Sequence, residues 1–333
     1  MFQNSSRPGD SDEIDHGARL LRAGRLVVFP TETVYGLGAN ALDAEAVARI
    51  YAVKRRPATS PLIVHVASIE MAQSLVANWT EIADRLARRF WPGPLTLVLQ
   101  KRSEKQSENQ PAIPAIVTAN LPTVGLRMPA HPIALALIRA AGVPLAAPSA
   151  NRFTELSPTT AEHVQRSLGS DVDLILDGGP CQVGIESTVL SLAGPQPVLL
   201  RPGGISRREL EAIVGAIDSV QEIQVGAHPA PGMHPRHYSP RTTLYLATNG
   251  KLPDQGQEQG QGQGLYLQYQ NPPSRTDVTI RQMPQSAANY AAALYEVLHQ
   301  ADDEDYNWIT VDTPPSTPEW EAIQDRLKRA AAK

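Results

Sequence analysis

Two cationic side chains at the end of a predicted helix could hold an anion. Lys54 and Arg56, in the stretch KRRPATSPLIVHV, flank the end of a helix predicted over 44–55, which Pro57 terminates. Because they straddle this end, both could converge on one anion, arginine through its planar fork and lysine as a point charge. They could instead be solvated charges that the helix dipole favours at a C-terminus. This stretch alone favours solvated charges.

Polar side chains also end or interrupt several apolar strands. Thr31 and Thr33 follow the strand predicted over 25–29 at alternate positions, so their hydroxyls could share one face. Turns use threonine in the same way. His65 ends the strand PLIVHV and, taken alone, indicates a core histidine with its hydrogen bonds satisfied. Arg127 lies in the apolar strand TVGLRMP, where a buried guanidinium needs a substrate anion or a structural ion pair as its partner.

The segment PSAN brings together groups that are typical of an anion site. Ser149 and Asn151 follow a predicted strand, and Ser157, with a proline after it, is predicted to begin a helix. A loop and a helix N-terminus after a strand commonly bind anions, although a turn with a capping residue accounts for the same residues. Ser187 in GIESTV and Arg201 in LLRPGG likewise place polar groups at strand ends.

The motifs of several enzyme classes are absent from the sequence. GLGANA contains only the start of a dinucleotide fingerprint, and no GxxxxGK[ST], GxSxG or HExxH occurs. Cys181 is the only cysteine, which excludes an internal disulfide and a thiolate zinc cage. We therefore predict a site that positions and neutralises its substrates rather than one that attacks them.

The composition is that of an ordinary globular protein. The 333 residues are 42% hydrophobic and 19% charged, and the net charge of −4 argues against a broad basic face for nucleic acid. The longest apolar run, 132–148, is interrupted by Arg139 and Pro144 and is too short to span a bilayer. The polar N-terminus has no apolar signal region. We expect a cytoplasmic protein that does not contact a membrane.

Alternating strand and helix patterns predict an α/β fold in two domains. We predict a flexible N-terminus over 1–14, a catalytic domain over 15–225 and a proline-rich linker over 226–240. A small α/β domain follows over 241–333, with a low-complexity, mobile segment over 254–264.

Several side chains also predict where individual helices begin or which face they bury. Asp43 and Ser68 are expected to be N-caps, and Ser206 with Glu209 is expected to form a capping box. A third predicted helix is expected to bury a stripe that begins at Ile82.

The resemblance of this chain to a known family is carried by eight segments in this order: FPTETVYGLGANA, KRRPATSPLIVHV, WPGPLTLVL, VGLRMPAHP, PLAAPSAN, GGPCQVGIESTV, LLRPGGIS and PGMHPRHYSP. Together they closely resemble the YrdC-like family, in its long form with an extra C-terminal domain. The motifs cover about 15–240, and beyond 241 the resemblance rests on domain order and size. It implies a twisted mixed sheet with flanking helices, followed by a smaller, Rossmann-like α/β domain.

The resemblance also implies an activity. Members of this long form join L-threonine, bicarbonate or CO₂ and ATP into threonylcarbamoyl-AMP and release pyrophosphate, which is the first step of threonylcarbamoyladenosine modification of tRNA. The threonine amine captures the carbon, and the resulting carbamate oxygen attacks the α-phosphate, so no enzyme nucleophile is needed. The implied partners are the proteins that later transfer the threonylcarbamoyl group to tRNA, with weak tRNA contact as a further expectation.

The family pattern assigns roles to individual residues of this sequence. It implies a catalytic set around the phosphates and carbamate: Lys54, Arg56, Ser149 and Asn151. It implies ATP contacts by Arg56, Ser60, Thr123, Ser149, Ser157, Arg201 and Tyr238. It implies an L-threonine pocket formed by Thr33, His65, Arg127, Ala147 and Ser187, in which Arg127 pairs with the substrate carboxylate. Mg²⁺ would accompany ATP, and the sequence identifies no ligand for it.

The linker around Tyr238 is expected to fold over the pocket as a lid that excludes water. Two other functions are alternatives to the synthesis of threonylcarbamoyl-AMP. One is a carbamoyl-adenylate-forming carbamoyltransferase domain, whose acylphosphatase-like domain and zinc fingers this chain lacks. The other is a noncatalytic RNA- or nucleotide-binding module, against which the acidic net charge argues.

Overall fold

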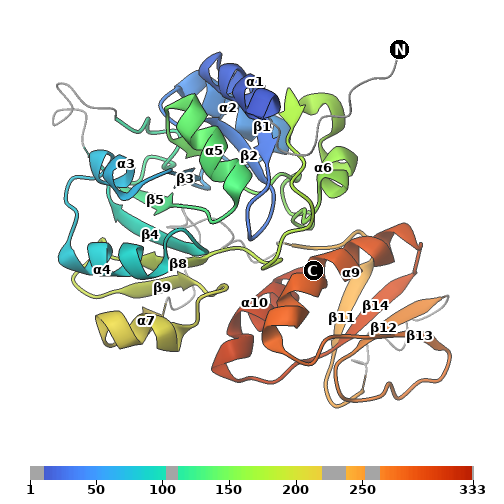
Figure 1. The fold of residues 1–333 in the computed structure, drawn as a ribbon. Helices are drawn as coiled ribbons and strands as arrows, with labels where there is room; N and C mark the ends of the chain where they lie inside the picture. Colours follow the sequence, from blue (N-terminus) through green and yellow to red (C-terminus); the bar gives the residue numbers. More distant parts are fainter. Residues whose placement is uncertain (1–10, 103–111, 220–237, 252–262, 332–333) are drawn as a thin grey trace, which may run out of the picture.

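Two β-sheets, each covered by helices, organise the protein (Figure 1). The structure, a computed structural model, describes residues 11–102, 112–219, 238–251 and 263–331. We call residues 11–219 of this set the N-terminal unit and residues 238–331 the C-terminal unit. No helix of the described residues is long and apolar enough to cross a membrane.

The N-terminal unit contains a mixed sheet of ten strands in the order β10-β9-β8-β4-β5-β3-β6-β2-β1-β7. Its strands are β1 (Val27–Phe29), β2 (Gly36–Asn40), β3 (Ile63–His65), β4 (Leu95–Gln100), β5 (Thr123–Arg127), β6 (Leu145–Ala146), β7 (Leu174–Ile175), β8 (Thr188–Ser191), β9 (Val198–Arg201) and β10 (Asp218–Ser219). Strands β3 and β5 are parallel, whereas β6 runs antiparallel to β3. The short strand β2 was not predicted from the sequence.

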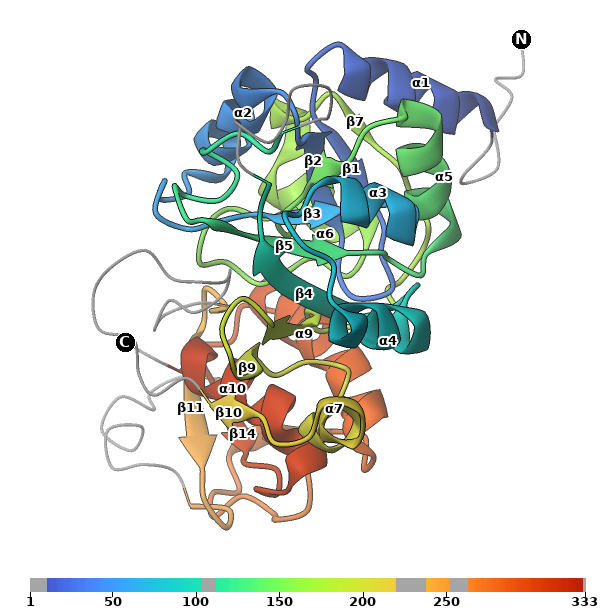
Figure 2. The same cartoon turned by 90° about the vertical axis from the view of Figure 1, so that its left-hand side faces the viewer.

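Helices cover both faces of this sheet (Figures 1 and 2). They are α1 (Ser11–Arg22), α2 (Ala44–Lys54), α3 (Ile69–Ser74), α4 (Glu81–Phe90), α5 (Pro132–Ala141), α6 (Ala161–Ser167) and α7 (Arg207–Val214), with a 3₁₀ turn, η2 (Gly169–Asp171). Leu21 of α1 and Leu137 of α5 belong to one buried cluster with Phe29 of β1. Helix α1 begins at Ser11, inside the span expected to be a flexible N-terminus.

The C-terminal unit contains a parallel sheet of four strands in the order β11-β14-β12-β13. Its elements are β11 (Thr243–Ala247), β12 (Gly264–Gln268), β13 (Val278–Gln282), α9 (Ala287–Asp303), β14 (Trp308–Asp312), η3 (Pro318–Trp320) and α10 (Glu321–Ala330). Strand β13 was not predicted from the sequence. The rest of this unit matches the predicted succession, and the predicted fold class, α/β with a mixed sheet and a smaller α/β domain, is confirmed.

The two units share one apolar cluster. Leu265, Leu294 and Ile309 belong to the core of the C-terminal unit, and the same cluster includes Val34 and Ile185 of the N-terminal unit. Helices α9 and α10 supply the C-terminal side of this contact (Figure 1). The units therefore bury apolar surface against each other as well as within themselves.

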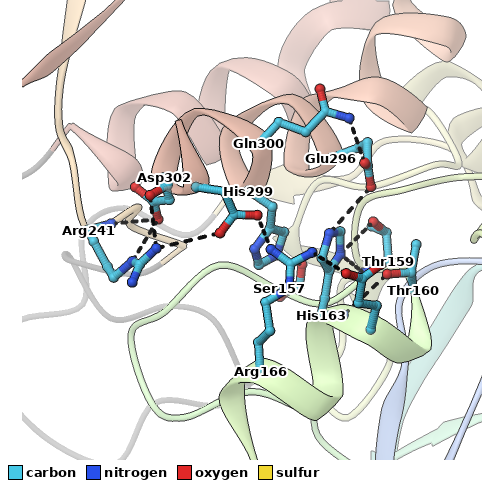
Figure 3. A network of polar contacts seen from close by, with 12 residues as sticks. Ser157, Thr159, Thr160, His163, Arg166, Arg241, Glu296, His299, Gln300 and Asp302 are labelled. Carbon is cyan, nitrogen blue, oxygen red and sulfur yellow. Dashed lines mark hydrogen bonds and ion pairs between the residues drawn. The ribbon is translucent and has the colours of Figure 1, made fainter. Parts of the chain in front are cut away.

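Polar contacts at the junction join α6 to α9 (Figure 3). The rings of His163 and His299 stack with their centroids 3.8 Å apart. His163 Nε2 lies 3.4 Å from a Glu296 carboxylate oxygen, and His299 Nε2 lies 3.2 Å from the Ser157 carbonyl oxygen. Arg166 of α6 pairs with Asp303 at the end of α9.

Most predicted helix starts are confirmed, and one is wrong. Asp43 caps α2, Ser68 caps α3, and Ser206 with Glu209 forms the capping box of α7. Ser157 does not begin a helix. Helix α6 starts later, at Ala161, with Thr160 as its N-cap.

Three other expectations differ from the structure or fall largely outside it. Ile82 is 38% exposed, so the stripe expected to begin there does not extend to this residue. The predicted linker over 226–240 and the mobile segment over 254–264 lie almost entirely outside the described residues.

Candidate active site

A pocket at one end of the large sheet collects most of the residues singled out in the sequence. About 540 Å³ of empty space, part of it open to solvent, lies between the residues that line it. It is lined by Thr31, Thr33, Val34, Tyr35, Gly36, Arg56, Ile63, His65, Arg127, Ala147, Pro148, Ser149, Glu186, Ser187, Arg201 and Tyr238.

Strand register explains why distant segments of the chain meet here. In the parallel pair β3 and β5, His65 lies opposite Arg127. The chain after β6 continues along β3, where the Ala147 N–H donates to the Ile63 carbonyl over 2.9 Å. A single antiparallel bridge then joins Ser149 to Gly36. Strand ends and the loops after them therefore form the pocket wall.

The turn that follows β1 is held by its own threonines. The Thr31 hydroxyl donates to the Val34 carbonyl over 2.6 Å and bonds the Thr33 hydroxyl over 2.8 Å. The Thr31 oxygen also accepts the backbone N–H groups of Thr33 and Val34, each over 3.2 Å. Both threonines thus serve the turn, and both also line the pocket.

Arg127 has an internal anionic partner. Its Nη2 lies 2.7 Å from Glu32 Oε1, and both side chains are buried. Its Nε donates to the Gly93 carbonyl over 3.3 Å. Glu32 Oε2 accepts the Ala130 N–H over 2.9 Å. The structural ion pair that the sequence left open is therefore present, in a guanidinium that still faces the pocket.

His65 is a buried, neutral histidine. Burial, followed by the nearby Arg127 charge, lowers the pKa of His65 to about 3. Its ring meets the Phe29 ring edge-on, with 5.9 Å between centroids. Within the described part of the chain, His65 Nδ1 has no hydrogen-bond partner. A buried nitrogen of this kind is suited to a hydrogen bond with a ligand.

Lys54 lies behind the pocket and holds the PSAN loop. It is fully buried, and its Nζ donates to the Ser149 carbonyl over 2.7 Å and to the Asn151 carbonyl. Burial, followed by the neighbouring Arg56 charge, lowers the pKa of Lys54 well below its ordinary value. Asn151 also lies behind the wall, where its Nδ2 donates to the Glu155 carbonyl over 2.9 Å. Of the set expected to be catalytic, only Arg56 and Ser149 line the pocket.

Two arginines provide positive charge in the pocket. Arg56 Nη2 donates to Ser60 Oγ over 2.5 Å and to the Pro61 carbonyl over 3.0 Å. Burial lowers the pKa of Arg56 to about 10, so Arg56 is charged at neutral pH. Arg201 donates through Nε and Nη2 to the carbonyl and hydroxyl of Ser187, each over 3.1 Å. Arg201 is near enough to Arg56 for their like charges to interact.

Three residues expected to contact ATP do not line the pocket. Ser60 lies behind Arg56 and fixes its guanidinium. Thr123, at the start of β5, lines a separate small cavity together with Pro61 and Gly125. Ser157 Oγ donates to Glu186 Oε1 over 2.5 Å, which explains why Ser157 does not cap a helix.

Glu186 is a pocket residue that the sequence reasoning missed. It is buried, and it accepts hydrogen bonds from the Tyr295 hydroxyl at 3.1 and 3.3 Å and from Arg326 Nε at 2.7 Å. Burial is the largest single influence and raises the pKa of Glu186. The charges of Arg326 and Arg201, together with hydrogen bonds from Ser157 and Arg326, outweigh it and leave the pKa lowered. The sequence did contain an indication of this residue. A glutamate in the apolar segment GIESTV, like Glu32 in PTETVYG, predicts a buried carboxylate, and a buried carboxylate requires polar or cationic partners.

Tyr238 lies against the same wall. It is 1% exposed, and its ring is 5.0 Å from the Arg326 guanidinium carbon and 5.9 Å from the Tyr295 ring centroid. Its φ of 59° lies in the left-handed region, which is uncommon for a tyrosine. Ser239 follows, and its N–H donates to the Thr154 carbonyl over 2.9 Å.

Comparison with known proteins identifies the family. The Sua5, YciO and YrdC family model, which carries the description "Telomere recombination", matches residues 19–203. The model "Threonylcarbamoyl-AMP synthase, C-terminal domain" matches residues 205–332. The chain belongs to the Sua5/YrdC family of threonylcarbamoyl-AMP synthases.

Relatives in this family match between about two thirds and nearly all of the chain. The threonylcarbamoyl-AMP synthase of Bacillus subtilis is 42% identical over 96% of this chain and 93% of its own length. That of Pyrococcus abyssi is 50% identical over 69% of this chain and 66% of its own length. The crystal structure of P. abyssi Sua5 complexed with L-threonine aligns with a TM-score of 0.85 at 37% identity, over 97% of this chain and 95% of that one.

The family, the enzymatic character and the activity predicted from the sequence are therefore confirmed. This Sua5/YrdC enzyme synthesises threonylcarbamoyl-AMP, the first step of threonylcarbamoyladenosine modification of tRNA. Family models of the synthase match both units of the chain. This favours the synthase over the two alternatives, a noncatalytic RNA-binding module and a carbamoyltransferase domain.

Proposed function

We propose that this enzyme assembles threonylcarbamoyl-AMP in the pocket described above, with L-threonine at one end and the ATP phosphates at the other. One observation carries the proposal: the residues expected to bind threonine and the arginines expected to bind phosphate line a single cavity. The substrates are L-threonine, ATP and bicarbonate or CO₂, and pyrophosphate is released.

The L-threonine end of the pocket is formed by Thr33, His65, Arg127, Ala147 and Ser187. Arg127 would bind the substrate carboxylate while its pair with Glu32 keeps the guanidinium in place. Neutral His65 would offer its Nδ1 to a polar group of the substrate. The threonine-bound structure of the P. abyssi relative supports this assignment, since the two folds align over nearly their full lengths.

The ATP end is formed by Arg56, Ser149, Arg201 and Tyr238. The two guanidinium groups would neutralise charge that develops on the α-phosphate as the carbamate oxygen attacks. Lys54 and Asn151 would act by fixing the loop that carries Ser149.

Three further residues and the linker were also assigned to the ATP end. Ser60 would act through Arg56, whose guanidinium it holds. Contacts of ATP with Thr123 and Ser157 stay predictions. So does the lid over the pocket, because residues 226–237 of its linker lie outside the described part of the chain.

The reaction requires alignment more than covalent catalysis. The threonine amine takes up CO₂ to give a carbamate, whose oxygen forms a bond to the α-phosphorus while the bond to pyrophosphate breaks. Holding the two reactants together and spreading the transferred charge over fixed cations lowers this barrier. The chain itself supplies no atom to the product.

Mg²⁺ would enter as part of the ATP complex. Among the described residues, no group of three or more His, Cys, Asp or Glu side chains could hold a metal ion. The described residues therefore form no cage for this ion, which the phosphates would hold instead.

The other partners follow from the reaction. Its product would pass to the proteins that transfer the threonylcarbamoyl group to tRNA. The proposal also includes weak contact of this protein with tRNA and a cytoplasmic location.

Pyrophosphate release by the purified protein tests the proposal. With ATP and bicarbonate, we expect release that depends on L-threonine and is weaker with L-serine, together with an adenylate product of the expected mass. Release with carbamoyl phosphate but not with L-threonine, or no release under any condition, would contradict it.

A further inference from the structure

A buried ion pair joins the C-terminal unit to the pocket wall. Arg326 of α10 is 0% exposed, and its Nε lies 2.7 Å from a carboxylate oxygen of Glu186, which lines the pocket. The Tyr295 hydroxyl of α9 donates to the same carboxylate over 3.1 Å. Two helices of the C-terminal unit therefore hold one anionic side chain of the N-terminal unit.

This anion is in a place where it could oppose nucleotide binding. Glu186 lines the pocket together with Arg56 and Arg201, the cations that we propose for the ATP phosphates. Its carboxylate would repel an entering triphosphate and would compete with it for those guanidinium groups. In a buried site this repulsion is screened less than at the surface. The charge of Glu186 must be offset if the pocket is to hold ATP.

Arg326 lies where it can neutralise the charge of Glu186, and it also contacts two other parts of the pocket wall. Its Nη2 donates to the Pro202 carbonyl over 3.1 Å, directly after Arg201. Its guanidinium carbon lies 5.0 Å from the ring centroid of Tyr238. One side chain of α10 thus contacts the glutamate, the end of β9 and the tyrosine at the start of the C-terminal unit.

We infer that Arg326 is a positioning residue for ATP binding, which neutralises Glu186 and holds the carboxylate away from the phosphates. The C-terminal unit then has a direct part in the reaction, since it completes the charge balance of the nucleotide site. This inference depends on one part of the proposed function, namely that this pocket binds ATP.

The test uses the full-length protein and the opposite effects that two substitutions should have. Arg326→Met removes the cation that is paired with Glu186 and leaves Arg201 as the remaining charge that offsets it. Arg201 would then be divided between Glu186 and the phosphates, so we expect the ATP dissociation constant to rise by about tenfold or more. Glu186→Gln removes the anion, so we expect ATP affinity to be retained or increased. Arg326 keeps Asp325 as a partner in that variant, since its Nη1 lies 2.6 Å from that carboxylate. The double variant should recover most of the lost affinity.

A matched control lies three positions further along the same helix. Arg329 pairs with Asp325 at 2.9 Å on a partly exposed face and does not line the pocket. Arg329→Met should leave the ATP dissociation constant and pyrophosphate release unchanged. Thermal unfolding of every variant would show that the folded state is retained. If Arg326→Met does not fold, Glu186→Gln and the double variant still give the comparison.

The outcomes separate this inference from the proposed function. If the ion pair were purely structural, its loss would lower the thermal stability of both single variants. ATP affinity would then be unchanged in both single variants, or weakened equally in both, and the double variant would not recover it. Either pattern would overturn the inference. Failure of the wild-type protein to bind ATP would instead contradict the proposed function.

Discussion

Arg56 is the residue at which the proposed chemistry can be tested most directly. Its guanidinium is fixed by Ser60 and lines the pocket. Removing one preorganised donor of this kind costs about 3 kcal/mol of transition-state stabilisation, or roughly a hundredfold in turnover. We expect that loss in threonine-dependent pyrophosphate release by Arg56→Ala. Arg55→Ala is the matched control, because this neighbour is exposed. Near-normal turnover of Arg56→Ala would contradict the phosphate role.

Arg127 tests the opposite end of the pocket. Arg127→Lys keeps a positive charge for Glu32 but loses the planar fork that can bind two carboxylates at once. Steady-state kinetics should show the KM for L-threonine raised by about tenfold or more, with the KM for ATP little changed. Equal increases in both constants would indicate a general disturbance of the pocket rather than loss of a carboxylate contact.

Sequence reasoning reached the pocket residues more readily than their supports. Thr33, His65 and Arg127 could be predicted because polar groups at the ends of neighbouring strands meet at one edge of a sheet. Lys54 was expected at the same site, but its ammonium turns to the carbonyl groups of the PSAN loop. Residue type and spacing do not determine which way a long, flexible side chain turns.

Elements whose ends are specified locally were predicted well. The N-caps of α2, α3 and α7 depend on hydrogen bonds within three residues of chain, which the sequence displays. Ser157 followed by proline carried the same local signal, but its hydroxyl is bonded to Glu186, which is distant in sequence. A tertiary hydrogen bond thus replaced the expected cap.

The contact between α6 and α9 should weaken in acid. Burial is the main cause that lowers the pKa of both His163 and His299, each to about 4. Unfolded histidines titrate near 6.5. The unfolded chain therefore binds more protons between about pH 6.5 and pH 4, and the free energy of unfolding falls as pH falls through this window. The loss is roughly 3 kcal/mol at most for one histidine.

Thermal melts from pH 8 to pH 4 would measure this dependence. A variant with both His163→Gln and His299→Gln should lose less stability over the window than the wild type. His16→Gln, at an exposed position of α1, should retain the wild-type slope. Parallel curves for the wild type and the double variant would assign the acid sensitivity to other groups.

At the scale of the whole molecule, the sequence predicted two α/β parts but not how they join. The family motifs and the proline-rich tract indicated the division. The pairing of Glu186 with Arg326 joins residues separated by 140 positions, and no local pattern reports it. The same holds for the apolar cluster that Val34 and Ile185 share with the C-terminal unit. Such contacts depend on how the two parts pack, which short segments do not determine.

The shared cluster and the buried ion pair predict that the two units unfold together. The four tryptophans allow each unit to be followed separately, since Trp79 and Trp91 lie in the N-terminal unit and Trp308 and Trp320 in the C-terminal unit. In urea, variants that retain one pair should show coincident transitions, as expected when no intermediate is populated. Because ATP binds the folded state, it should move both transitions to higher urea by the same amount. A C-terminal transition at lower urea that ATP leaves in place would show that the units are uncoupled, and would also argue against a role for Arg326 in the nucleotide site.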